Sequence, residues 1–129
     1  MKLDEMVATM PYAAALGLNL SAAQPDEVIG SIQWTPERCT TGGVLHGGVL
    51  MTLADSLGAV CAFLNLPKGA STATIESKTN FFRAVSDGTV TGTTRPIHVG
   101  RSTIVVQTEL RNDAGKLAAM TLQTQAVIT

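Results

Sequence analysis

The sequence predicts an α+β domain in which an antiparallel sheet wraps one long helix. Two observations lead to this prediction: residues 46–64 have the apolar periodicity of a buried helix, and almost everything after residue 71 alternates with period two. The chain has 129 residues and no visible linker or repeat, so we expect a single domain over residues 1–129. A hydrophobic fraction of 45% is enough for a sizeable core.

The predicted helix from His46 to Leu64 has one apolar stripe and one side of small residues. The stripe consists of Leu50, Leu53, Leu57, Val60, Cys61 and Leu64. The opposite side consists of Gly48, Thr52, Asp55, Ala59 and Ala62. A helix that is apolar or small all round is expected to be enclosed. Because one sheet covers only one side of a helix, we predict that a second copy of the chain covers the other.

Five strands are predicted, with a short helix before them. The strands are expected at residues 27–35, 71–82, 88–98, 102–111 and 116–128, and turn residues separate the last four. Pro96 interrupts the third strand and predicts a bulge or a sheet edge there. The first segment, to about Leu16, is expected to be helical with an interruption at Pro11.

The composition argues against several function classes. A formal charge of −1 and a pI near 6.0, with scattered basic residues, provide no surface for nucleic acid. The acidic start and the short N-terminal apolar run predict neither a signal peptide nor a membrane span, so we expect a cytoplasmic protein with no membrane partner. Cys39 and Cys61 lack metal-ligand spacing and are expected to be reduced.

Asp55 is the only residue between Arg38 and Lys68 that carries a formal charge at pH 7. Aspartate is a poor helix former, and burial of an unpaired carboxylate costs several kcal/mol. A carboxylate in the middle of an apolar helix therefore indicates a functional site. The alternative is that Asp55 pairs with Arg83 or Arg101, or hydrogen-bonds a partner subunit.

The start of the helix has glycines where a ligand can approach the backbone. His46-Gly47-Gly48 follows a Gly-rich loop at residues 40–43. Backbone N–H groups at the positive end of a helix suit a thioester carbonyl as well as a phosphate. Together with a carboxylate two turns later, they form the pair of groups that acyl transfer requires.

The stretch from His46 to Asp55 resembles the HGG-x5-A-D/E signature of the hotdog-fold acyl-CoA thioesterases of the 4-hydroxybenzoyl-CoA and phenylacetate-pathway (PaaI-like) type. Residues 74–83, 94–101 and 115–118 are similar to later strands of that family, in the family's order. The resemblance covers the chain from about Pro11 to the C-terminus. It implies the hotdog fold, in which a five-stranded antiparallel sheet wraps a long central helix, and homodimers that usually pair into tetramers.

The resemblance also implies a role for each matching residue. Asp55 corresponds to the nucleophile or to the base that activates water, and the backbone N–H of Gly47 corresponds to the group that polarises the thioester carbonyl. His46 would lie beside that carbonyl, holding the site or assisting the thiolate. Thr74 falls near a hydroxyl that positions water in some relatives. In that fold, Gly47 and the carboxylate belong to opposite subunits.

The predicted site also includes two candidate arginines, and it differs from the family pattern at two positions. Arg83 and Arg101 are candidates for binding the phosphates of coenzyme A, or they are ordinary surface charges. Relatives commonly carry Gln or Asn fifteen residues before the carboxylate, where this chain has Thr40. Some relatives have Ser or Thr four residues after it, where this chain has Ala59. Both departures remove polar contacts around the attacking group and leave a more apolar pocket.

The predicted function is hydrolysis of an acyl-CoA thioester, aryl or short- to medium-chain, to the free acid and coenzyme A. No metal or redox cofactor is implied, because the leaving thiolate of coenzyme A needs none. One alternative is an acyl-CoA binding or sensing module that has lost turnover. A hotdog enzyme of the enoyl-CoA hydratase type ranks last, because its usual motifs are not evident.

Overall fold

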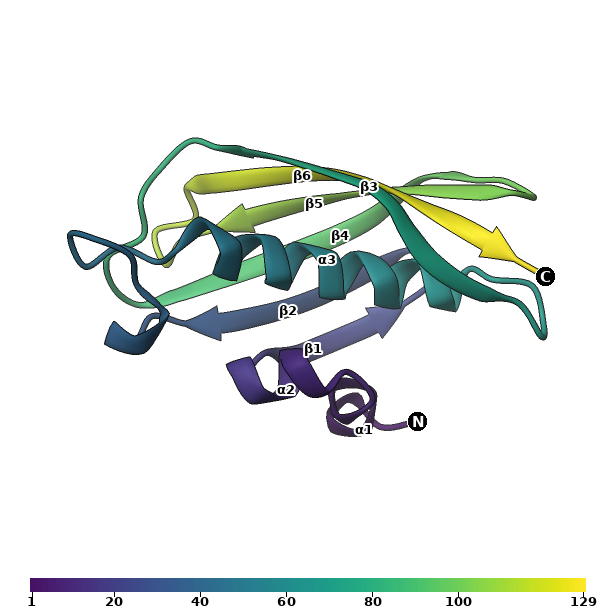
Figure 1. Ribbon diagram of the computed structural model, residues 1–129, viewed down its shortest axis with the longest axis horizontal. Coiled ribbons are helices and arrows are strands. Elements are labelled where there is room, and N and C mark those ends of the chain that lie inside the picture. Colours follow the sequence, from purple (N-terminus) through teal and green to yellow (C-terminus); the bar gives the residue numbers. More distant parts are fainter.

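Helix α3 (Gly47–Leu64) lies along one face of a six-stranded antiparallel sheet that curves around it (Figure 1). The computed structural model describes residues 1–129. The strands are β1 (Asn19–Gln24), β2 (Glu27–Gln33), β3 (Ser71–Phe81), β4 (Thr89–Val99), β5 (Thr103–Arg111) and β6 (Leu117–Ile128). The other elements are the short helices α1 (Leu3–Ala8) and α2 (Pro11–Leu16) and the 3-10 turn η1 (Pro36–Arg38). The predicted α+β architecture is confirmed.

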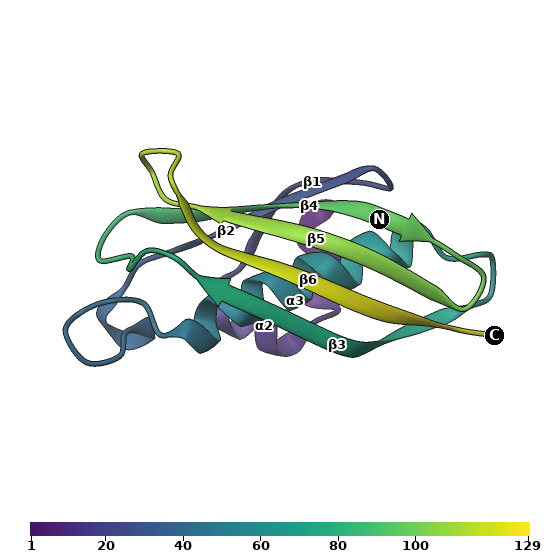
Figure 2. The same cartoon turned by 90° about the horizontal axis from the view of Figure 1, so that it is seen from above.

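The strand order of the sheet is β1-β2-β4-β5-β6-β3. Figure 2 shows β4, β5, β6 and β3 side by side over α3. The helix leads from β2, near one edge, to β3 at the opposite edge, so it crosses the whole sheet. A register shift in β4 directly after Pro96 confirms the bulge predicted there.

The sheet has six strands where five were predicted. The additional strand, β1, forms a hairpin with β2 and lies at the edge of the sheet. Its sequence has a single large apolar residue, Leu20, and a bulge between Leu20 and Ala22 interrupts the pairing. A short strand with so little apolar alternation gives no clear period-two signal.

The N-terminal segment forms two helices rather than one interrupted helix. Pro11 is the first residue of α2, a position where its missing N–H has no helical partner to lose. Gly17 ends this helix in the left-handed region, with φ of 85°. Pro11 therefore begins the helix that borders the outer side of α3.

Leu57 fixes the position of α3 on the β2–β4 half of the sheet. Gly30 of β2 and Gly92 of β4 are direct partners in the antiparallel pairing. A Cβ atom added at either glycine would lie 2.6 Å from a methyl carbon of Leu57, whose side chain is completely buried. The two glycines therefore form the seat of this leucine.

A bulge in β3 turns two polar side chains of this strand toward the same side of the sheet, next to α3. The pairing of β3 with β6 shifts between Thr74 and Glu76, so Ile75 is an extra residue. In a regular strand, Thr74 and Ser77 would point to opposite faces because they are an odd number of residues apart. With the bulge, both line the same hollow beside α3.

The buried side of α3 is wider than the predicted stripe. It consists of Val49, Leu50, Leu53, Ala54, Leu57, Gly58, Val60, Cys61 and Ala62. Ala62, which was predicted on the small side, is completely buried because it follows Ala54 and Gly58 at helical spacing. The curved sheet covers both flanks of the helix. The prediction that Ala62 lies on the side opposite the apolar stripe was therefore wrong.

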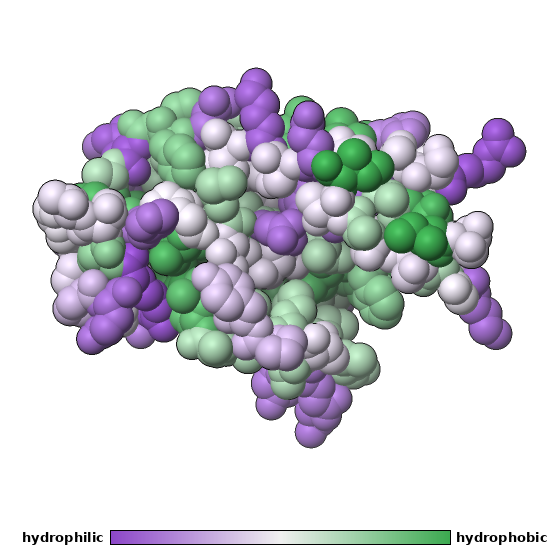
Figure 3. Space-filling model, in the orientation of Figure 1, coloured by the Kyte–Doolittle hydropathy of each residue, from purple (hydrophilic) through white to green (hydrophobic).

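The opposite side of α3 is uncovered in the single chain, where Met51, Asp55 and Phe63 are exposed. On this face of the molecule, strongly hydrophilic groups gather mainly at the rim, and the centre is mostly neutral or weakly hydrophobic (Figure 3). By length and composition α3 is apolar enough to cross a membrane, a test that buried core helices also pass, and 50% of it is buried in the chain.

Candidate active site

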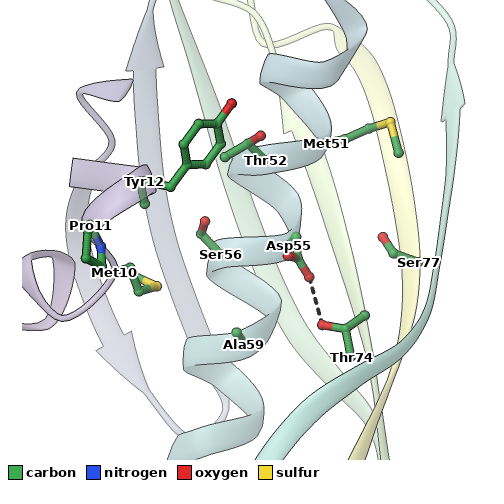
Figure 4. A pocket seen from close by; sticks show the side chains of 11 residues that line it. Met10, Pro11, Tyr12, Met51, Thr52, Asp55, Ser56, Ala59, Thr74 and Ser77 are labelled. Atoms are coloured by element: carbon green, nitrogen blue, oxygen red, sulfur yellow. Dashed lines mark hydrogen bonds between the residues drawn. The ribbon is translucent and has the colours of Figure 1, made fainter. Parts of the chain in front are cut away.

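Asp55 lies on the uncovered side of α3, where two side chains from the sheet hold it. Thr74 of β3 donates a hydrogen bond from Oγ1 to Asp55 Oδ1 at 2.9 Å, and Figure 4 shows the two side chains pointing toward each other. Gln123 of β6 donates from Nε2 to the same oxygen at 2.6 Å. The other oxygen, Oδ2, accepts no hydrogen bond from the chain. The carboxylate therefore has one fixed oxygen and one open oxygen.

These hydrogen bonds replace the ion pair considered from the sequence. Neither Arg83 nor Arg101 forms a salt bridge with Asp55. The two salt bridges of the chain are Arg95–Glu27 and Arg111–Glu109. In the single chain Asp55 is exposed rather than enclosed, so solvent stabilises its charge without a basic partner.

A hollow of about 590 Å³ opens over Asp55. Its lining consists of Met10, Pro11, Tyr12, Ala13, Met51, Thr52, Asp55, Ser56, Ala59, Thr74 and Ser77. Figure 4 shows Met10, Pro11 and Tyr12 on one side of α3, and Thr74 on the other. Methionine, aromatic and alanine side chains line the hollow together with four serine and threonine side chains and a single carboxylate, so it suits an apolar group attached to a reactive polar one.

The start of α3 forms a second, separate site. His46 caps the helix, and its Nδ1 accepts a hydrogen bond from the Gly48 N–H at 2.8 Å. Gly47 is the first helical residue, so its N–H has no acceptor within the helix. A Cβ atom at Gly47 would lie 3.2 Å from the ring of Phe81, which shows how closely this ring covers the backbone. The predicted carbonyl-polarising N–H is therefore present at a helix N-terminus.

Arg83 belongs to this second site. A hollow of about 400 Å³ is lined by Leu45, Gly47, Leu50, Phe81, Phe82, Arg83, Ala84 and Val85. Phe81 and Phe82 are about half exposed there, at 50% and 55%. The structure thus brings one candidate phosphate-binding arginine beside the helix N-terminus.

Gly47 and Asp55 cannot act on one carbonyl within the same chain. They are eight residues apart on a straight helix, which corresponds to about 12 Å along its axis. An attacking group and a polarising group must both lie roughly 3 Å from the reacting atoms. Each chain therefore carries two halves of a site that face different hollows.

Two predicted residues lie apart from both groups. Thr40 is exposed in the loop before α3, where its N–H donates to the Val44 carbonyl at 2.9 Å. It lines neither the hollow of Asp55 nor that of Gly47. Arg101 lies beyond the C-terminal end of α3, in a hollow shared with Asn65 and Leu66.

The sequence did not reveal the role of Gln123 or the wall contributed by α2. The apolar alternation of β6 lies on the face away from α3, where Leu122 is 48% exposed. Gln123 and Gln125 occupy the opposite face, and both are 1% exposed. The sequence does place two glutamines on one face of this strand. The contact of Gln123 with Asp55, however, depends on the strand order, which a period-two pattern does not reveal.

Cys61 is excluded as a nucleophile of this site. Burial, with a smaller contribution from the negative charge of Asp26, raises its pKa to about 11. The reactive thiolate form is therefore rare at neutral pH.

Comparison with known proteins assigns the family. The family model described as Thioesterase superfamily matches residues 42–119. A candidate esterase of Vibrio cholerae is 39% identical over 85 residues, which are 66% of this chain and 57% of that protein. The 1,4-dihydroxy-2-naphthoyl-CoA hydrolase of Escherichia coli is 31% identical over 86 residues, which are 67% of this chain and 63% of that protein. Both alignments span less than two thirds of the relative's length.

The similarity extends over the whole chain in a solved structure. A thioesterase from Haemophilus influenzae has a TM-score of 0.93 and 28% sequence identity, and the match covers 100% of this chain and 92% of that one. The family match and this structural similarity confirm the predicted hotdog fold and the predicted enzyme class, a thioester hydrolase.

Proposed function

This chain belongs to the Thioesterase superfamily, and on that basis we propose that it hydrolyses an acyl-CoA thioester to the free acid and coenzyme A, with Asp55 as nucleophile or general base. The observation that carries the proposal is the state of Asp55, whose Oδ1 is fixed by two donors and whose Oδ2 is left open. The apolar lining of the adjacent hollow supports an aryl or a short- to medium-chain acyl group.

Asp55 acts through Oδ2 in either role. As a general base, it takes a proton from water while the water oxygen attacks the thioester carbon; the C–S bond then breaks, and the thiolate leaves and takes up a proton. As a nucleophile, Oδ2 itself bonds to that carbon and expels the thiolate, and water then cleaves the resulting anhydride. Both routes give one acid and one thiol for each water consumed.

A second copy of the chain completes the site in this proposal. The separation of Gly47 and Asp55 and the uncovered side of α3 both support a homodimer. In such a dimer, Gly47 and His46 of one subunit face Asp55 of the other, and the Gly47 N–H stabilises the negative charge that develops on the thioester oxygen. Two such dimers would pair into the tetramer that the family resemblance implies.

Arg83 is the first candidate for the phosphates of coenzyme A, since its guanidinium suits a phosphate and it lines the hollow at the start of α3. Arg101 is the second candidate. It lies beyond the other end of α3, so within one chain the two arginines do not serve the same phosphate.

A non-catalytic acyl-CoA binding module is the competing function. Two observations favour it: Thr40 lies outside the hollow of Asp55, and Ala59 adds no hydroxyl to it. Such a module would bind acyl-CoA in the same hollow without releasing thiol.

Release of coenzyme A, followed with a thiol-reactive dye across aryl-, short- and medium-chain acyl-CoAs, tests the proposal. Wild type and Asp55→Asn are compared, with thermal unfolding as the control for folding. We expect turnover by wild type and a loss of about 10³-fold in the variant, since general-base catalysis contributes at this scale. Binding of acyl-CoA by both proteins without thiol release would instead support the binding module.

A further inference from the structure

Gln123 is a buried amide that reaches the carboxylate from beneath the helix. It lies in β6, is 1% exposed, and donates the shorter of the two hydrogen bonds to Asp55 Oδ1, at 2.6 Å against 2.9 Å from Thr74. Burial of an amide is unfavourable unless its hydrogen bonds are made. The position of this side chain in the core therefore needs an explanation beyond packing.

The hydrogen-bond arrangement gives Gln123 a fixed direction. An ionised carboxylate only accepts, so the amide must present its NH₂ group and not its oxygen. Nε2 has two hydrogens, one for Asp55 Oδ1 and one for Thr74 Oγ1 at 3.3 Å. Thr74 in turn donates its single hydroxyl hydrogen to Oδ1. The three side chains form a closed set that holds one carboxylate oxygen and leaves the other open.

Helix α3 is shaped to admit this amide. Gly58 lies about one turn after Asp55, and a Cβ atom added there would be 2.1 Å from Gln123 Oε1. Glycine inside a helix costs about 1 kcal/mol relative to alanine. The residue at position 58 thus leaves the space that Gln123 occupies.

The neighbouring Gln125 shows that burial alone does not produce this contact. It lies two residues later on the same face of β6 and is also 1% exposed. Neither its Nε2 nor its Oε1 has a hydrogen-bond partner, whereas Gln123 lacks a partner only at Oε1. The two glutamines share strand, face and burial, and differ in their contact with Asp55.

We propose that Gln123 is a positioning residue that fixes the rotamer of Asp55 so that Oδ2 is presented to the thioester. Gly58 provides the space, and Thr74 is the second support. This inference rests on the proposed function and adds a residue for which the HGG-x5-A-D/E signature has no position.

Gln123→Met and its matched control Gln125→Met test the proposal. Methionine has a similar length and removes the amide. We expect kcat of Gln123→Met to fall by about 10²-fold with little change in KM, the scale associated with misplacement of a reacting group. Gln125→Met should keep the wild-type kcat, and both variants should unfold at similar temperatures. Gly58→Ala, which displaces the amide without removing it, should lower kcat by a smaller factor.

The outcomes separate this proposal from the proposed function. If wild type turns over and Gln123→Met matches it, the positioning role is wrong and the thioesterase reading stands. Equal losses in Gln123→Met and Gln125→Met also overturn the role, since they indicate a general effect of polar burial. If Gln123→Met does not fold, Gly58→Ala decides: an unchanged kcat overturns the role. If wild type releases no thiol, both proposals fall.

Discussion

The two halves of the sheet hold α3 in different ways. On β2 and β4, Leu57 fits onto Gly30 and Gly92 through apolar contact. On β3 and β6, hydroxyls and amides face the helix instead. All five buried side-chain atoms without a hydrogen-bond partner belong to these two strands: Thr72 Oγ1, Ser77 Oγ, Gln123 Oε1, Gln125 Nε2 and Gln125 Oε1.

This contrast separates stability from function. An unpaired buried polar group costs about 1–3 kcal/mol, so the β3–β6 half lowers the stability of the fold where it surrounds Asp55. Proteins tolerate such local conflicts mainly at functional sites. The β2–β4 half is therefore expected to set stability, and the β3–β6 half to set the rate.

The largest effect is expected from Leu57→Ala. Removal of a fully buried leucine side chain from its seat on Gly30 and Gly92 should lower the free energy of unfolding by about 2–5 kcal/mol. The folded fraction should keep its kcat, because the contacts of Asp55 lie on the other half of the sheet. Urea unfolding measures the stability, and coenzyme A release measures kcat. A fall in kcat without loss of stability would contradict the assignment of stability to the β2–β4 half and of rate to the β3–β6 half.

Thr74→Val should affect the rate and spare stability. The substitution keeps the shape but removes one of the two donors to Asp55 Oδ1, so we expect kcat to fall by about 10-fold, which corresponds to about 1.4 kcal/mol. Thr72→Val is the matched control on the same strand, because its buried hydroxyl has no partner. The control should retain kcat, and a similar loss in both variants would refute the special position of Thr74.

Gly58→Ala tests whether positions 58 and 123 contribute to stability as a coupled pair. In the wild-type background, the substitution should stabilise α3 by about 1 kcal/mol through its higher helix propensity. Contact between the new methyl group and the Gln123 amide should offset this gain. In a Gln123→Ala background the contact is absent, and the gain should appear in full. Unfolding free energies of the four proteins in this double-mutant cycle give the coupling. Additive values would mean that Gly58 does not make room for Gln123.

The last effect concerns Cys61 on the buried side of α3 and appears only above pH 9.0. Its folded-state pKa of about 11 lies above the ordinary 9.0, so folding favours the protonated thiol. The resulting stability is fully present below pH 9.0 and is lost as the pH rises through about 11. The difference in unfolding free energy between wild type and Cys61→Ala should shrink over this range. A difference that is independent of pH would contradict the assigned burial effect.

The local patterns were sufficient for most of the fold. The helix predicted at residues 46–64 is α3 (Gly47–Leu64), and the predicted strands fall within a few residues of β2 to β6. These elements have long, regular apolar periods, which is the signal that sequence carries best. β1 was missed because a six-residue edge strand with one large apolar residue has no such period.

The candidate site was only partly predictable. Asp55 stood out as a lone charge in an apolar helix, and Gly47 as a bare backbone at a helix start. Gln123 did not, because its contact depends on β6 lying between β5 and β3, an arrangement that no local pattern encodes. The bulge that turns Thr74 toward α3 is equally invisible to a period-two pattern.

The central claim is that Asp55 of one subunit and the Gly47 N–H of another act on the same thioester. A subunit-mixing experiment with two inactive variants, Asp55→Asn and Gly47→Pro, tests it most directly. Proline removes the N–H yet suits the first position of a helix, and His46, with φ of −60° and ψ of 136°, has the backbone conformation preferred before proline.

Each variant alone should release little coenzyme A, whereas the two subunits, unfolded together and reassembled, should regain activity. In a random mixture of dimers, about one quarter of the sites combine an intact Asp55 with an intact Gly47 from the other subunit. Recovery of roughly a quarter of the wild-type rate is the predicted result. No recovery from mixed dimers whose formation has been verified would contradict the shared site.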